Sequence, residues 1–265
     1  MVAADWLRAA TSAARVAREE WGLGLDAPIS DLLVVAEQVA GVPVCVLDLG
    51  PGLAGAYLVR RARPFIFVNG AESVVRQRFT LAHELGHFRF GDEAVIDGDD
   101  SLTASVKDPK EKAANAFAAE LLAPEKGLRG WVAARNDPTV DGELIARLAR
   151  WFGVSAPVAY YRLKNANLLP AGVAGRNLAS MISGAQYRTI ERTLEIGDFR
   201  DELLEIKTSG TLPRLPEAMR RNAVGAYRDG LIDVDRLAEL LRRDREAVLE
   251  LVSDQQPAEF GESDW

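Results

Sequence analysis

Histidine and cysteine are the two residue types that this sequence nearly lacks. The chain of 265 residues has two histidines and one cysteine, Cys45. A single cysteine excludes an internal disulfide and fits a reducing compartment. Because Cys45 lies in the apolar run 42–47, a buried structural thiol is favoured over a reactive one.

Excess positive charge and long apolar runs are absent as well. The formal net charge of -7 argues against a nucleic-acid binder that works by bulk charge. No apolar run is long enough to span a bilayer, and residues 1–18 lack the unbroken apolar core of a signal peptide. We therefore expect a soluble, cytoplasmic protein, in which an apolar fraction of 48% suffices for a buried core.

Both histidines lie in one short motif, His83-Glu84-Leu85-Gly86-His87. On a helix, residues four apart project from the same face, so the two imidazoles can bind one tetrahedral metal ion. Glu84 points to one side of this pair, where a carboxylate can act as a general base without being a ligand. The alternative is an amphipathic helix with two surface histidines, but such a chain would be expected to scatter its histidines.

A catalytic zinc needs a third protein ligand besides two histidines, with water in the fourth position. No further histidine remains, so a carboxylate, a cysteine or a rarer group must serve. Glu111 is favoured, because a carboxylate on the first turn of an alanine-rich, buried-looking helix needs a partner. The competing carboxylates, Asp92, Glu93 and Asp108, lie in polar stretches where a solvated role is enough.

Hydrophobic periodicity predicts a mostly helical chain with three short strands before the motif. The expected helices before residue 130 cover 4–21, 30–40 with Ser30 as cap, 72–90 and 109–123. The expected strands cover 44–49, 55–61 and 65–68. The acidic, turn-rich residues 91–108 favour a solvated loop over a flexible rim above a cleft.

The later part of the chain is also predicted to be helical, with helices over 143–152 and 156–168 that resemble a helix-turn-helix in outline. Their modest charge favours packing over DNA binding. The Gly, Ala and Ser content of residues 171–184 indicates a linker. We expect further helices up to residue 252, with breaks at Gly197, Gly210–Pro213 and Asp229–Gly230, and a loose acidic tail over 253–265.

The motif predicts hydrolysis of a peptide bond. Zinc lowers the pKa of water and polarises the scissile carbonyl, while Glu84 transfers a proton to the leaving amine. The oxyanion needs a further donor, for which Tyr57, Tyr160, Tyr161 and the arginines stay open. We also expect an extended substrate to pair along the edge of the strand over 65–69.

Beyond the motif, the chain resembles the ImmA/IrrE metallopeptidases. The resemblance is carried by Val68-Asn69-Gly70, by residues 76–88, and by Glu111 with residues 115–124, all in the family's order. It covers about residues 28–170. It implies an α+β, mostly helical fold, in which a zincin-like minigluzincin core contains a small three-stranded sheet.

The resemblance also implies a site and a function. Zinc, one ion per chain, with manganese as an alternative, is expected on His83, His87 and Glu111, with Glu84 as catalytic acid and base. Family members typically cleave a helix-turn-helix repressor and so switch on stress-response or mobile-element genes. We therefore predict a zinc metallo-endopeptidase, and keep as alternative a non-catalytic regulatory module that binds a repressor or DNA, of a toxin–antitoxin or phage-related kind.

The predicted domain organisation follows from these assignments. It consists of an N-terminal helix over 1–27, a metallopeptidase domain over 28–170, a helical region over 171–252 and the tail over 253–265. Direct DNA binding and membrane contact are not expected.

Overall fold

A computed structural model describes residues 3–98, 108–135, 140–169, 173–182 and 214–253. The chain divides into two compact units, residues 1–211 and 212–265. None of the described helices combines the length and the hydropathy needed to cross a bilayer. The domain boundaries at residues 27 and 170 remain predictions.

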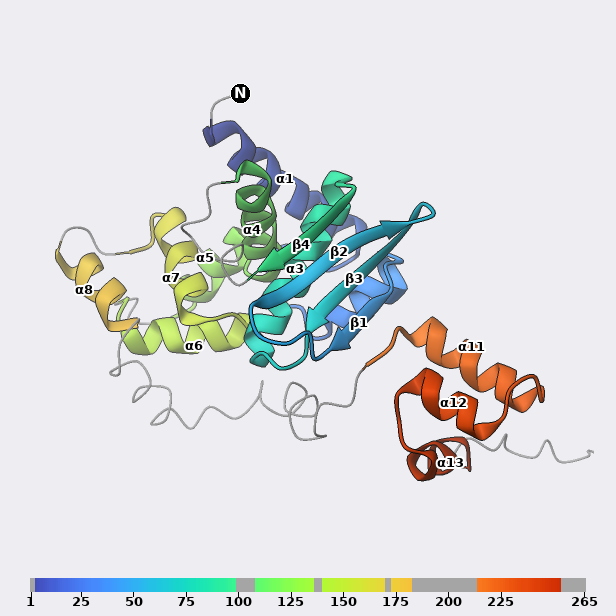
Figure 1. Cartoon of the computed structure of the whole chain (residues 1–265). Coiled ribbons are helices and arrows are strands. Elements are labelled where there is room, and N and C mark those ends of the chain that lie inside the picture. The colour runs from blue at the N-terminus through green and yellow to red at the C-terminus, as the bar shows by residue number, and fades with distance from the viewer. Residues whose placement is uncertain (1–2, 99–107, 136–139, 170–172, 183–213, 254–265) are drawn as a thin grey trace, which may run out of the picture. The chain divides into compact units, whose positions relative to one another are not determined.

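The first unit contains a mixed sheet with the strand order β1-β3-β2-β4 (Figure 1). Its strands are β1 (Val44–Leu47), β2 (Leu53–Arg60), β3 (Arg63–Asn69) and β4 (Ala94–Gly98). β1 runs parallel to β3, whereas β2 is antiparallel to both β3 and β4. The three predicted strands are confirmed in place, and β4 is an additional strand in the stretch that was predicted to be a loop. Its few apolar residues are too weak a signal by themselves, and pairing with β2 supplies the rest.

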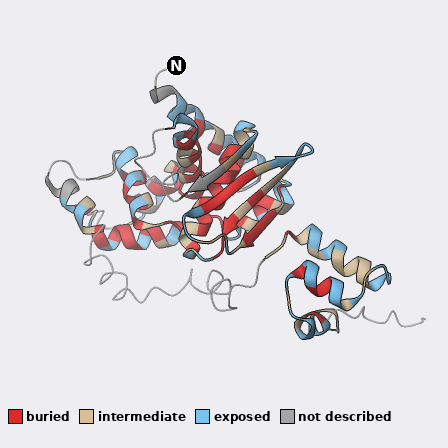
Figure 2. Ribbon diagram, viewed as in Figure 1, coloured by how far each residue is buried: buried red, intermediate tan, exposed pale blue. Residues whose placement is uncertain are grey.

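Two long helices pack in succession behind the sheet (Figure 1). α3 (Val74–Phe90) lies against β2 and β3, and it ends at Gly91, whose φ of 72° is the left-handed conformation common after helices. α4 (Pro109–Leu122) lies against α3, with Asp108 accepting a hydrogen bond from the Lys110 amide and Pro109 in the first turn. Both helices are buried over much of their length (Figure 2), which confirms the predicted motif helix and its neighbour.

Buried arginines fix the C-terminal end of α4. Arg162, on α7 (Ala156–Asn165), donates to the Ala123 carbonyl at 2.8 Å and to the buried carboxylate of Glu120. Arg18, on α1 (Ala3–Glu20), donates to the Leu121 carbonyl. Since charged hydrogen bonds of this kind are strong when buried, they hold the C-terminal end of α4 against α7 and α1.

The remaining helices of the first unit depart from the sequence prediction in two places. The helix predicted over 30–40 is a short α2 (Leu32–Val34) followed by a π-helix, η1 (Val35–Val39), and its cap is Asp31 rather than Ser30. The linker predicted over 171–184 contains α8 (Val173–Ile182), which is held by burial of Leu178 and Ile182. The other helices are α5 (Glu125–Ala133) and α6 (Gly142–Phe152).

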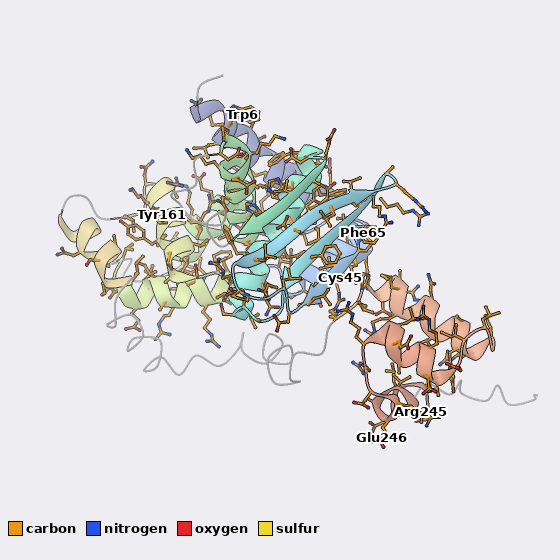
Figure 3. The ribbon with its side chains drawn as sticks, viewed as in Figure 1. Trp6, Cys45, Phe65, Tyr161, Arg245 and Glu246 are labelled. Atoms are coloured by element: carbon orange, nitrogen blue, oxygen red, sulfur yellow. The ribbon has the colours of Figure 1, made fainter. Side chains whose placement is uncertain are left out.

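The second unit is a group of three helices, α11 (Glu217–Arg228), α12 (Val234–Leu241) and α13 (Arg245–Ser253). Its hydrophobic core is formed by Leu237, Ala238, Leu241 and Val248. The predicted break at Asp229–Gly230 is confirmed, and a further break occurs before Arg245 and Glu246 at the start of α13 (Figure 3). The predicted breaks at Gly197 and Gly210–Pro213, and residues 254–265 of the tail, lie outside the described residues.

The turn between β2 and β3 stores backbone strain. Arg61 and Ala62 have φ values of 53° and 60°, although turns of this kind favour Asn-Gly. We expect Ala62→Gly to stabilise the first unit by about 1 kcal/mol, the scale of the left-handed penalty for a residue with a side chain. The check is the midpoint of thermal unfolding, which should rise by roughly 2–4 °C.

A reverse substitution provides the control for this prediction. Gly52 has a φ of 85° and open space around its Cα, so Gly52→Ala adds conformational strain without a clash. It should lower the same midpoint. If the thermal midpoints of Ala62→Gly and Gly52→Ala shifted in the same direction, backbone conformation would not explain the change in stability.

Candidate metal centre

The structure brings the three predicted metal ligands together. His83 and His87 lie one turn apart on α3, are fully buried, and place their Nε2 atoms 3.0 Å from each other. Glu111, in the first turn of α4, places Oε2 at 3.2 Å from Nε2 of His83 and Oε1 at 3.6 Å from Nε2 of His87. One ligand atom from each residue lies within 4.8 Å of the other two.

Gly86 allows the two helices to approach this closely. A Cβ at this position would lie 3.2 Å from the Ala114 Cα and 3.3 Å from the Phe117 ring. The motif glycine therefore lets the backbone of α4 pack directly on α3. That close packing is what brings the short carboxylate side chain of Glu111 within reach of both imidazoles.

Each imidazole is oriented by a side-chain oxygen within hydrogen-bonding distance of its Nδ1 atom, the ring nitrogen that faces away from the cluster. Nδ1 of His83 is 3.0 Å from Oδ1 of Asn115, and Nδ1 of His87 is 2.8 Å from Oδ2 of Asp92. A neutral ring that donates from Nδ1 keeps a lone pair on Nε2. Two such lone pairs and a carboxylate then converge on one place, which is the donor set that a divalent cation such as zinc requires.

The electrostatics of the site favour ionised carboxylates. Burial raises the pKa of Glu111, but hydrogen bonds and electrostatic interactions with His83 and His87 outweigh burial and lower the pKa overall. Burial likewise raises the pKa of Asp92, and hydrogen bonds from Lys110 and His87 lower it overall. Nζ of Lys110 is 2.8 Å from Oδ1 of Asp92. Asp92 therefore links the imidazole of His87 to a cation at the surface.

The carboxylates that competed with Glu111 have other positions. Asp92 faces the outer nitrogen of His87, and Asp108 caps α4. Glu93 is exposed. Cys45 is buried in β1 (Figure 3), and it is not part of the cluster found among the described residues. Sequence reasoning gave no role to Asn115, although its spacing of four from Glu111 places both on one helix face.

Glu84 and the candidate oxyanion donors lie on different parts of the unit. Glu84 is fully buried on α3 and stands outside the three-ligand cluster. Tyr57 lies on β2 with its ring 6.4 Å from that of Phe88, and burial together with the charge of Asp92 raises the pKa of its hydroxyl. Tyr160 and Tyr161 lie on α7, with Tyr161 exposed (Figure 3). Through this contact with Phe88, Tyr57 packs on the motif helix.

The strand predicted to bind substrate is in the wrong place for that role. β3 is hydrogen bonded to β1 on one side and to β2 on the other. Its backbone groups are therefore already paired, and an extended peptide has no edge to join. The outer strands of the sheet are β1 and β4. The prediction failed because a strongly apolar strand sequence is typical of a buried strand, and a buried strand usually lies in the centre of a sheet.

Removal of the Asn115 side chain should weaken metal binding. Asn115→Ala takes away the acceptor that orients His83, so we expect affinity for zinc to fall about 10–100-fold. Asn115→Asp keeps an acceptor oxygen and should restore most of the affinity. Lys112→Ala, at an exposed site on the same helix, is the control, and competition with a chromogenic chelator measures all of these variants. Equal affinity of the alanine variant and the parent would contradict this role.

Comparison with known proteins places the core of the chain in a family. The family model described as the IrrE N-terminal-like domain matches residues 37–164. The radiation response metalloprotease IrrE of Deinococcus radiodurans is 36% identical over 114 residues, which cover 40% of this chain and 32% of that protein. The protein of the same name from Deinococcus deserti is 32% identical over 166 residues, covering 59% of this chain and 54% of that protein.

The matched segments thus span about a third and about a half of the length of these two relatives. The family match includes α3 and α4, which carry all three residues of the cluster. Residues 37–164 thus match the IrrE N-terminal-like domain, and the two relatives support a place for this domain among the ImmA/IrrE metallopeptidases.

Proposed function

We propose that this chain is a zinc-dependent endopeptidase that hydrolyses a peptide bond in a protein substrate in the cytoplasm. The observation that carries the proposal is the convergence of Glu111 on His83 and His87, with Glu84 next to His83 in the same helix. Family membership supports the same class of chemistry. The donor set of two imidazoles and one carboxylate is that of known catalytic zinc sites with an open fourth position.

The chain's own residues divide the work of hydrolysis. His83, His87 and Glu111 would hold the ion, which when bound supplies a Lewis acid that polarises the carbonyl and lowers the pKa of water. Glu84 takes the proton from the attacking water and delivers it to the leaving amine. Burial of Glu84 excludes bulk solvent from this proton transfer. Tyr57 is our candidate for the donor to the oxyanion, because it packs against α3.

The outer edge of β4 is the proposed docking edge for the substrate backbone. β4 follows α3 after a short connection that contains Asp92, and β2 pairs with only one of its edges. No described strand covers the other edge. An extended peptide that adds to such an edge gains main-chain hydrogen bonds along its length. This edge replaces β3 as the candidate.

We further propose that the substrate is a helix-turn-helix repressor whose cleavage relieves repression of stress-response or mobile-element genes. The support is the resemblance to the family. The test is incubation of the purified chain and zinc with the product of a neighbouring repressor gene, followed by mass spectrometry of the intact products. Two fragments that a chelator suppresses are expected, whereas an intact repressor under all conditions would contradict the proposal.

A second candidate function is a binding module that uses the helical hairpin of α6 and α7. Gly153, with a φ of 61°, joins the two helices, as expected for a helix-turn-helix outline. However, Arg147 pairs with Glu143 at 2.7 Å, and Arg162 is buried against Glu120. These contacts favour packing or protein contact over DNA binding. Formation of a stable complex without cleavage would favour this candidate.

A further inference from the structure

The strand β2 makes an unusually close contact with α3 at Gly55. A Cβ built at Gly55 would lie 2.5 Å from Cγ2 of Thr80, 2.7 Å from Oε1 of Glu84 and 2.8 Å from the Phe67 carbonyl oxygen. The backbone φ of Gly55 is outside the left-handed region, so conformation does not require glycine here. The residue is glycine because its neighbours occupy the space that a side chain would take.

Two faces of α3 therefore have two different neighbours. The face with His83 and His87 meets α4, where Glu111 and Asn115 contact the imidazoles. Thr80 and Glu84 are four residues apart and so share another face, which meets β2 at Gly55. The carboxylate of Glu84 thus lies against a strand that contributes none of the three ligands of the cluster.

A change of register in the sheet occurs at the same point. Leu53 pairs with Gly98 and Gly55 pairs with Asp97, so that β2 has one extra residue, Ala54, relative to β4. Bulges of this kind bend a strand locally and are common beside active sites. The bulge thus lies directly beside Gly55, the residue at which β2 comes close to Glu84.

We propose that Gly55 is a positioning residue that sets the place of the Glu84 carboxylate. The inference rests on the proposed function, because it assigns Glu84 the proton transfer. The absent side chain at Gly55 leaves a recess between α3 and β2, which the carboxylate of Glu84 shares with the methyl group of Thr80. A methyl group there displaces the carboxylate from its position and leaves the three metal ligands, which face α4, in place.

The competing explanation is that Gly55 is needed only for packing against Thr80 and Phe67. Two double variants of the metal-free chain separate the explanations by thermal unfolding. Gly55→Ala should lower the midpoint by several degrees. The first double variant adds Glu84→Ala, which removes the carboxylate. The midpoint difference between this double variant and the Glu84→Ala single variant should be at most half of the difference between Gly55→Ala and the parent. The second double variant adds Thr80→Ser, which removes only the methyl contact, and it should recover less of the lost midpoint.

This first experiment does not depend on catalysis. Full recovery by Thr80→Ser with none by Glu84→Ala would overturn the proposal, as would an unchanged midpoint in Gly55→Ala. If the chain cleaved no substrate, the proposed function would be wrong, but the coupling between Gly55 and Glu84 could still be measured by thermal unfolding. The two failures are thus distinguishable.

The second experiment measures zinc content and steady-state cleavage by the full chain, with a repressor that the parent chain cleaves. Gly55→Ala should keep one zinc per chain and lower kcat at least tenfold with little change in KM. Gly130→Ala is the matched control, because its Cβ would meet nothing within 4 Å, and it should leave both constants unchanged. An unchanged kcat in Gly55→Ala, or loss of zinc together with kcat, would overturn the proposal.

Discussion

Glu84→Gln should keep zinc and lose cleavage. The amide has nearly the shape of the carboxylate but cannot accept a proton, so we expect kcat to fall on the order of 10²–10⁴-fold, the range for removal of a general acid–base. Zinc affinity should be unchanged, because Glu84 lies outside the cluster of His83, His87 and Glu111. The measurements are zinc content by mass spectrometry and the rate of fragment formation.

The buried position of Glu84 requires a control for folding. The thermal midpoint of Glu84→Gln should stay near that of the parent, since the side chains are almost equal in volume. A variant that folds, binds zinc and cleaves at the parental rate would exclude Glu84 as the proton-transfer group. Loss of zinc in this variant would instead identify Glu84 as a ligand.

Glu111→Ala is expected to have the largest effect on metal binding. It removes one of three converging ligands, so the loss should exceed the 10–100-fold that is typical for a residue that only orients a ligand. Cleavage should be lost with the metal and return in part at high zinc concentration. A zinc titration with a competing chelator gives the affinity, and the cleavage rate as a function of zinc gives the recovery.

Glu93→Ala is the matched control for Glu111→Ala. It removes an exposed carboxylate that sequence reasoning had treated as a competing ligand, and it should change neither affinity nor rate. Full retention of zinc after Glu111→Ala would show that the third ligand is another group.

Much of the site could be predicted because its residues act through local spacing. The pairing of His83 and His87 follows from helical periodicity alone. Glu111 was identifiable because a carboxylate in an apolar helix needs a partner, and the structure places it 3.2 Å from His83. The helices α3 and α4 were recognisable from Gly91 and Pro109, whose effects on helix ends are local.

The features that sequence reasoning missed depend on contacts between distant segments. β4 is a strand because β2 pairs with it, and its own residues give only a weak signal. Asn115 was visible on the same helix face as Glu111, but its use depends on where His83 lies. An isolated glycine in a strand, such as Gly55, does indicate close approach of another segment. The sequence alone does not identify that segment as α3.

Anomalous diffraction from crystals grown with zinc would show directly whether one zinc ion lies between His83, His87 and Glu111. We expect a single anomalous peak at the zinc absorption edge, about 2.0–2.2 Å from Nε2 of each histidine and from an oxygen of Glu111. A crystal with no peak between these three side chains, or with a peak that Glu111 does not contact, would contradict it.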